Sequence, residues 1–150
     1  MPSADQFTRP ERLLFLCYGN ICRSPFAAGV WSLGAPEARS AGFIESEGRT
    51  TPATYRSLAA RHGVDLTRHG SRYADAELIA WAQAIVVMDD HNLDDLRRLY
   101  PEAEERTFRL GAFLDKPRRE IEDPYYLDLA RATEVYAQMY EAVTNMLGFQ

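Results

Sequence analysis

The sequence predicts a single α/β domain with a four-stranded parallel sheet and helices on both of its faces. Short, continuously apolar runs, such as residues 13–17 and 84–88, are typical of strands that are buried on both faces. These runs alternate with segments that carry helical spacing and helix start and stop residues, which is the order of strand–helix–strand units. A chain of 150 residues is long enough to bury one such core.

Four strands and five helices are expected, and residues 1–10 are polar enough to be a disordered lead before a domain at 11–150. The expected strands are residues 12–17, 38–43, 84–88 and 107–113. The expected helices are residues 24–33, 52–61 and 75–81, a segment after Asp90 that runs to 99, and residues 134–147.

Helix signals justify the helices of the first half. Ser24 and Pro25 begin a helix, because proline lacks an N–H that would be unpaired in the first turn, and Gly34 ends it. Pro52 begins the next helix, for which Gly63 is the expected C-cap.

In the second half, a stop signal and an apolar face define the longer helices. Pro101 ends the helix that follows the third strand, because the residue before a proline avoids helical geometry. The last helix carries an apolar face with helical spacing. That face comprises Val135, Met139, Val143 and Met146.

The loop after the first strand, residues 17–25, predicts an anion-binding site with a nucleophile. Its sequence is Cys-Tyr-Gly-Asn-Ile-Cys-Arg-Ser-Pro, in which Gly19 and Asn20 tolerate positive φ. Backbone N–H groups and a helix N-terminus can converge there on an oxyanion, which Arg23 can clamp. The same positive field favours a thiolate at the base of such a loop, so Cys17 is the candidate nucleophile.

Composition narrows the class of protein. A net charge of −5 argues against nucleic acid or an anionic membrane as a partner. The first ten residues lack the apolar core of a signal peptide, and no run approaches the roughly 18 apolar residues of a membrane span. Two cysteines five positions apart give no disulfide framework, so a cytoplasmic location is expected, and no metal-ligand cluster is evident.

Residues 17–25 resemble the signature C-x-G-N-I-C-R-S-P of the low-molecular-weight protein tyrosine phosphatases. Residues 122–126, Glu-Asp-Pro-Tyr-Tyr, resemble the acid loop of that family, and weaker similarity covers the chain from Arg12 to its end. The resemblance implies a phosphate-binding loop after the first strand and hydrolysis of protein phosphotyrosine and small aryl phosphates, as in bacterial members. It implies no cofactor and no metal.

The resemblance also implies a mechanism. Cys17 attacks phosphorus and forms a phosphocysteine, while Asp123 acts as general acid and then as general base. Arg23 and the loop backbone hold the phosphoryl oxygens, and Ser24 supports the thiolate. The phosphate-binding residues are Tyr18, Gly19, Asn20, Ile21, Cys22, Arg23 and Ser24.

Supporting residues follow from the same resemblance. Asn20 is expected in a left-handed conformation held by Ser40 and His69, with Asp89 orienting His69. Cys22 can form a reversible disulfide with Cys17. From the residues alone, Cys22 can equally be structural, His69 can face solvent, and Asp123 can simply begin a turn before Pro124.

Aromatic residues are expected at the mouth of the pocket that the phosphate-binding loop forms. Tyr125 and Tyr126 are expected to form a wall that stacks on the substrate ring, and the resemblance allows either to be phosphorylated. The family often carries an aromatic residue after the segment that matches Ser40, but residues 44–48 supply none, so Phe43 is the nearest substitute. A glutamate of the family pattern is replaced by Ala28.

Two other functions are compatible with the loop. An arsenate reductase uses the same fold, but no cysteine follows Cys22, so external thiols or Cys22 itself would have to resolve the intermediate. A phosphotyrosine-binding module would be expected to lack Cys17, Arg23 or Asp123, and all three are present. The expected partner is therefore a phosphotyrosine protein substrate, with a bacterial tyrosine kinase as one candidate, and neither nucleic acid nor a membrane.

Overall fold

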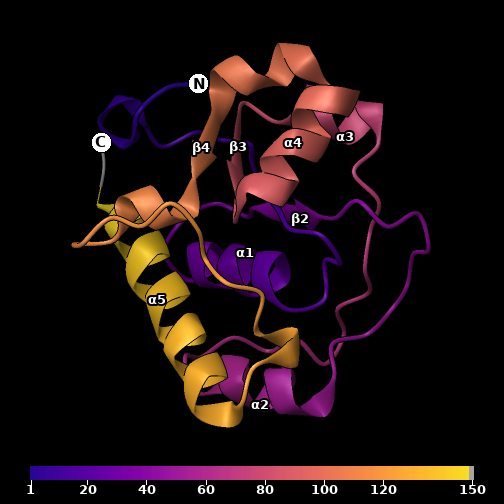
Figure 1. The fold of residues 1–150 in the computed structure, drawn as a ribbon, viewed down its shortest axis with the longest axis vertical. Coiled ribbons are helices and arrows are strands. Elements are labelled where there is room, and N and C mark those ends of the chain that lie inside the picture. Colours follow the sequence, from indigo (N-terminus) through magenta and orange to yellow (C-terminus); the bar gives the residue numbers. More distant parts are fainter. Residues whose placement is uncertain (149–150) are drawn as a thin grey trace.

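A computed structural model describes residues 1–148 and contains one four-stranded sheet in the order β2-β1-β3-β4 (Figure 1). All three strand pairs are parallel. The strands are β1 (Leu13–Leu16), β2 (Arg39–Ala41), β3 (Ala84–Val87) and β4 (Thr107–Arg109). The α-helices are α1 (Arg23–Gly34), α2 (Ala53–Ala60), α3 (Ala76–Trp81), α4 (Asp90–Leu99) and α5 (Leu129–Leu147). The predicted α/β fold is confirmed.

β1 is one of the two inner strands of the sheet, and its four residues are all buried. Successive side chains of a strand point to opposite faces. Leu13 and Phe15 therefore join one apolar cluster, and Leu14 and Leu16 join the other. This two-sided burial explains why the strand is a continuous apolar run in the sequence.

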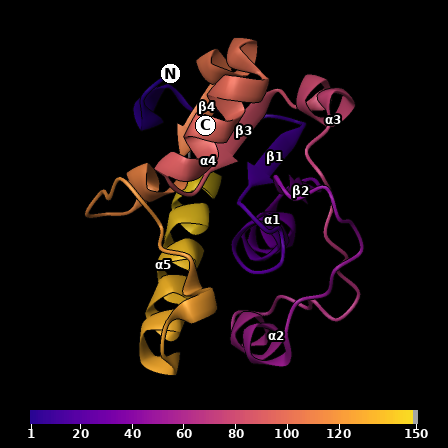
Figure 2. The ribbon, with the colours of Figure 1, turned by 45° about the vertical axis from the view of Figure 1, so that its right-hand side comes forward.

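Helices cover both faces of the sheet. α1, α2 and α5 pack together beside the first cluster, where α1 and α5 contact each other (Figures 1 and 2). α3 and α4 supply Leu78, Ile79, Leu93 and Leu96 to the second cluster. None of the described helices is long and apolar enough to cross a membrane.

The fourth strand and the last helix differ most in extent from the sequence-based expectation. The fourth strand ends at Arg109, and a 3-10 helix, Leu110–Phe113, follows it. α5 begins at Leu129 instead of 134, because the carboxylate of Asp128 accepts a hydrogen bond from the N–H of Arg131 and caps the helix.

The N-terminal segment also differs from the expected disordered lead. Ala4–Gln6 form a 3-10 helix, and the following Phe7 is only 2% exposed. Its ring lies edge-on to Trp31, Phe108 and Phe113, with centroid distances of 5.2 to 6.2 Å. A single apolar residue therefore anchors a polar segment beside β4 (Figure 2).

The carboxyl ends of β1 and β3 lie side by side at one edge of the sheet. Leu16 pairs with Val87, so Cys17 and the loop after β1 leave the sheet beside Asp89. This edge is where open parallel sheets bind ligands.

Candidate active site

The loop between β1 and α1 turns tightly through a left-handed residue. Asn20 has φ +54°, the only positive value at a non-glycine position in residues 1–148. Gly42, at the end of β2, lets this loop pass closely: a Cβ there would lie 2.7 Å from the carbonyl oxygen of Tyr18. The N–H of Asn20 points back toward the strand end and donates to the Sγ of Cys17 at 3.2 Å.

Cys17 is buried at the base of this loop and has two polar neighbours. Besides the N–H of Asn20, the Oγ of Ser24 lies 3.0 Å from its sulfur. Asn20 donates through Nδ2 to the same Oγ at 2.7 Å, which leaves the Ser24 proton able to point at the sulfur. A thiolate at this position would accept from both groups.

The side chain of Asn20 is fully buried and fully bonded. Its Nδ2 also donates to Ser40 Oγ at 3.0 Å, and its Oδ1 accepts from the N–H of Arg72 at 2.9 Å. The carbonyl of Asn20 accepts from Nε2 of His69 at 2.7 Å. Burial lowers the pKa of His69, although this hydrogen bond acts in the opposite direction. The structure thus brings Asn20, Ser40 and His69 together.

Arg23 is a buried cation that connects three segments. Its Nη1 donates to Asp89 Oδ2 at 2.7 Å and to the carbonyl of Ile121 at 2.8 Å. Burial disfavours the charge, but the nearby Cys17, Asp89 and Asp123 outweigh it and raise the pKa of Arg23. Since Ile121 is two residues before Asp123, Arg23 joins the anion loop to the acid loop.

The expectation that Asp89 orients His69 is wrong. Asp89 bonds Arg23, and it caps α4 by accepting from the N–H of Asn92 at 2.9 Å. His69 is instead fixed by the carbonyl of Asn20. The nearest sequence signal was the position of Asp89 at the end of a strand, which also suits a partner for an arginine in the neighbouring loop.

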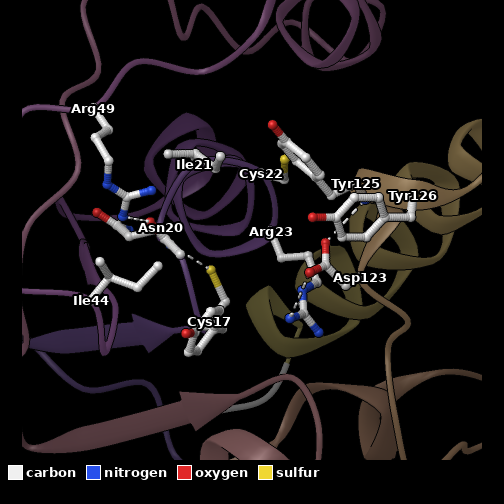
Figure 3. Close-up of a pocket in the computed structure, with 12 residues that line it drawn as sticks. Cys17, Asn20, Ile21, Cys22, Arg23, Ile44, Arg49, Asp123, Tyr125 and Tyr126 are labelled. Carbon is white, nitrogen blue, oxygen red and sulfur yellow. Dashed lines mark hydrogen bonds and ion pairs between the residues drawn. The ribbon is translucent and has the colours of Figure 1, made fainter. Parts of the chain in front are cut away.

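Asp123 lies above Arg23, with its Oδ2 3.9 Å from Nη2, and its side chain is 47% exposed (Figure 3). Its Oδ1 accepts from the N–H of Tyr125. The hydroxyl of Tyr55, on α2, donates to the carbonyls of Pro124 and Tyr125 at 3.2 and 2.7 Å. These bonds fix the short 3-10 turn Pro124–Tyr126 that carries the carboxylate over the loop.

One cavity of about 250 Å³ joins these groups. Ile21, Ile44, Tyr125 and Tyr126 form apolar parts of its wall, and Tyr126 is 91% exposed at the mouth. The other lining residues are Cys17, Tyr18, Gly19, Asn20, Cys22, Arg23, Arg49 and Asp123. A nucleophilic sulfur, a buried arginine and a carboxylate thus share one small opening.

Comparison with known proteins identifies the family. The family model described as low molecular weight phosphotyrosine protein phosphatase matches residues 12–149. The chain belongs to this family. It is therefore a protein-tyrosine-phosphatase by class, a hydrolase of phosphoric monoesters.

Relatives of this phosphatase differ in the substrate that their names give. A protein-arginine-phosphatase from Geobacillus stearothermophilus is 33% identical over 77% of this chain and 80% of its own length. The low molecular weight protein-tyrosine-phosphatase Ptp of Acinetobacter johnsonii is also 33% identical, over 80% and 84%. The crystal structure of the Erwinia amylovora tyrosine phosphatase AmsI superposes with a TM-score of 0.85, at 27% identity over 95% of each chain.

The wall of the phosphatase pocket differs from the expectation in one residue. Phe43 does not line the cavity; it is partly buried against the second apolar cluster, and its N–H donates to the carbonyl of Tyr18. The next residue, Ile44, faces the cavity instead. The chain bends at Phe43, just after the end of β2, so these two neighbouring side chains point in different directions.

Cys22 is a buried free cysteine next to Arg23, at the N-cap of α1. Burial and the nearby Cys17 and Asp123 raise the pKa of its thiol. A raised pKa keeps Cys22 in its neutral form, whereas a thiolate is the form that reacts. In the structure Cys22 is thus a buried neutral thiol, and its disulfide with Cys17 stays a prediction.

Sequence reasoning missed Tyr55, Arg49 and Thr51. Arg49 donates through Nη2 to the carbonyl of Gly19, and Thr51 donates through Oγ1 to that of Ile21, both at 2.7 Å. These contacts join residues thirty positions apart, and they lie in an irregular segment without periodicity. Only the fold brings them to the anion loop.

Proposed function

We propose that this phosphatase hydrolyses phosphotyrosine in proteins, and small aryl phosphates, through a phosphocysteine on Cys17. The observation that carries the proposal is the cavity that Cys17, Arg23 and Asp123 share, at the base of which the Asn20 N–H points at the Cys17 sulfur. We also propose that the protein acts in the cytoplasm, with a bacterial tyrosine kinase among its candidate substrates.

In the first step, the Cys17 thiolate attacks phosphorus, and the sulfur–phosphorus bond forms as the phosphorus–oxygen ester bond breaks. Asp123 in its protonated form donates to the departing phenolate oxygen. Arg23 and the loop N–H groups bond the three remaining phosphoryl oxygens, where charge redistributes in the transition state.

In the second step, water hydrolyses the phosphocysteine. Asp123, now a carboxylate, takes a proton from the water as its oxygen attacks phosphorus, and the sulfur–phosphorus bond breaks. The thiolate of Cys17 leaves, stabilised by the hydroxyl of Ser24 and the N–H of Asn20. Inorganic phosphate then dissociates.

The pocket wall favours an aryl ester over a phosphoarginine. Ile44, Ile21 and the two tyrosines offer apolar surface to an aromatic ring. A guanidinium group needs anionic or carbonyl acceptors, and among the described residues that line the cavity Asp123 is the only carboxylate. That residue is already assigned to proton transfer.

Leaving-group dependence tests the mechanism. Asp123→Ala should slow phenyl phosphate hydrolysis by about 10²- to 10³-fold, but 2,4-dinitrophenyl phosphate much less, because a good leaving group needs no proton. Glu122→Gln, which changes a neighbouring carboxylate paired with Arg131, is the matched control. Cys17→Ser should abolish turnover and leave no acid-trapped phosphocysteine. Full activity of folded Cys17→Ser would reject the mechanism.

Paired peptides test the substrate. Phosphotyrosine and phosphoarginine in the same flanking sequence should give a higher kcat/KM for phosphotyrosine. The opposite preference would assign the protein to arginine phosphatases. Arsenate reduction with external thiols, or tight phosphotyrosine binding without turnover, would instead support the two functions that the anion loop alone allows.

A further inference from the structure

Every carbonyl of the anion loop from Tyr18 to Cys22 accepts a hydrogen bond from outside the loop. The donors, in order, are Phe43 N at 2.8 Å, Arg49 Nη2 at 2.7 Å, His69 Nε2 at 2.7 Å, Thr51 Oγ1 at 2.7 Å and Tyr136 Oη at 3.4 Å. In a trans peptide the C=O and the following N–H point in opposite directions. Holding each carbonyl outward therefore keeps the next N–H directed at the anion.

The peptide unit between Gly19 and Asn20 has a special position in this series. Its carbonyl accepts from the cationic guanidinium of Arg49, and its N–H donates to the sulfur of Cys17. Figure 3 shows Arg49 and Cys17 on either side of Asn20. A charge-assisted hydrogen bond to the oxygen polarises the amide and strengthens its N–H as a donor.

This unit is also the one that can most easily rotate. Gly19 has no side chain to restrict ψ, and Asn20 has φ +54°. A half-turn of the peptide plane would bring Asn20 to a negative φ, which L-residues prefer, and would direct the carbonyl toward the anion. The productive orientation therefore depends on contacts from outside the loop.

Arg49 is well placed to supply such a contact. Its backbone N–H and carbonyl both bond the buried Ser71, and its Nε donates to the carbonyl of Ser46. No carboxylate within the described residues 1–148 forms an ion pair with it. The half-buried charge of Arg49 thus acts on the carbonyl of Gly19 without neutralisation.

We propose that Arg49 is a positioning residue of the anion loop: it holds and polarises the Gly19–Asn20 peptide so that the Asn20 N–H faces the sulfur and the bound phosphoryl group. Thr51 holds the Ile21–Cys22 peptide in the same way. The catalytic part of this inference rests on the proposed phosphatase mechanism. The oxyanion-binding part does not, so it can be tested separately.

Orthovanadate binding by calorimetry and p-nitrophenyl phosphate kinetics test the proposal. Arg49→Met should weaken orthovanadate binding by about tenfold and lower kcat/KM by at least as much, because one donor is misaligned and not removed. Arg49→Lys should recover most of both, since a cation still reaches the carbonyl. The amide proton of Asn20 should move upfield in the NMR spectrum of Arg49→Met.

Arg68→Met is the matched control, because it removes the same charge from an exposed side chain of a neighbouring loop. Unchanged orthovanadate affinity in folded Arg49→Met, or an equal loss in Arg68→Met, would overturn the proposal. If Arg49→Met does not fold, Thr51→Val is the second test. Weaker orthovanadate binding at an unchanged melting temperature supports the proposal, and wild-type orthovanadate affinity rejects it. Failure of turnover with intact orthovanadate binding would instead reject the proposed function.

Discussion

The guanidinium of Arg23 and the carboxylate of Asp89 are joined by a 2.7 Å hydrogen bond, with the arginine side chain only 3% exposed. Asp89→Asn keeps a residue that can cap α4 but removes the negative charge. We expect a loss of about 2 kcal/mol in the free energy of unfolding, as for a hydrogen bond to a charged group. Urea denaturation measures this loss of stability. The KM should also rise. An unchanged free energy of unfolding and an unchanged KM would show that Ile121 and Asp123 suffice to hold Arg23.

Ser24→Ala should slow the second chemical step more than the first. The Ser24 hydroxyl lies 3.0 Å from the sulfur, where it stabilises the thiolate that leaves the phosphocysteine. We expect a burst of p-nitrophenol followed by turnover about tenfold slower than wild type. Rapid-quench measurement of the phosphoenzyme checks this, and a steady state without a burst would contradict it.

Tyr55→Phe should loosen the acid loop without removing its packing. The ring of Tyr55 stacks on Tyr125, while its hydroxyl holds the carbonyls of Pro124 and Tyr125. Loss of the hydroxyl should cost about 1 kcal/mol of stability. We also expect kcat to fall more for phenyl phosphate than for 2,4-dinitrophenyl phosphate, because only the poorer leaving group depends on proton donation by Asp123. Equal changes for both esters would rule out an effect through Asp123.

Acid should destabilise the fold through His69. Burial lowers the pKa of His69 below its ordinary value of 6.5. The unfolded chain therefore takes up a proton near pH 6.5 that the folded chain does not. The free energy of unfolding should be greatest above this pH and fall as the pH drops through it. His69→Gln should flatten that fall; part of it remains because burial also lowers the pKa of His62. An unchanged slope in His69→Gln would contradict this assignment.

Phe7→Ala should destabilise the protein at a distance from the active site. Truncating an aromatic residue that is buried among three others costs about 3 to 4 kcal/mol. Chemical denaturation should show this loss, while the orthovanadate affinity of the folded variant stays at the wild-type value. Changing the exposed Thr8 to Ala is a suitable control.

The residues that could be predicted from the sequence carry local signals. The apolar run of β1, the Gly19–Asn20 turn and the Ser24–Pro25 helix start lie within a dozen positions and indicate strand, loop and helix together. The acid loop could be recognised because Asp123 and Pro124 stand in a short motif.

The rest depends on contacts that no local pattern encodes. The pairing register of β1 and β3 brings Asp89 to Arg23. Neither strand's own sequence encodes this register, so the sequence could not predict Arg23 instead of His69 as the partner of Asp89. Residue type alone favours Phe43 as the wall residue, whereas the bend of the chain after β2 directs Ile44 to the cavity. Phe7 was missed because one apolar side chain in a polar segment has no periodicity.

The bonds of Arg23 have a consequence for the order of folding. Its partners Asp89 and Ile121 lie 66 and 98 positions away along the chain. Contacts at such separations form late, because long loops must close first. A nascent or truncated chain that carries the whole anion loop would therefore lack catalytic competence, and in refolding experiments activity should return only with the last cooperative step.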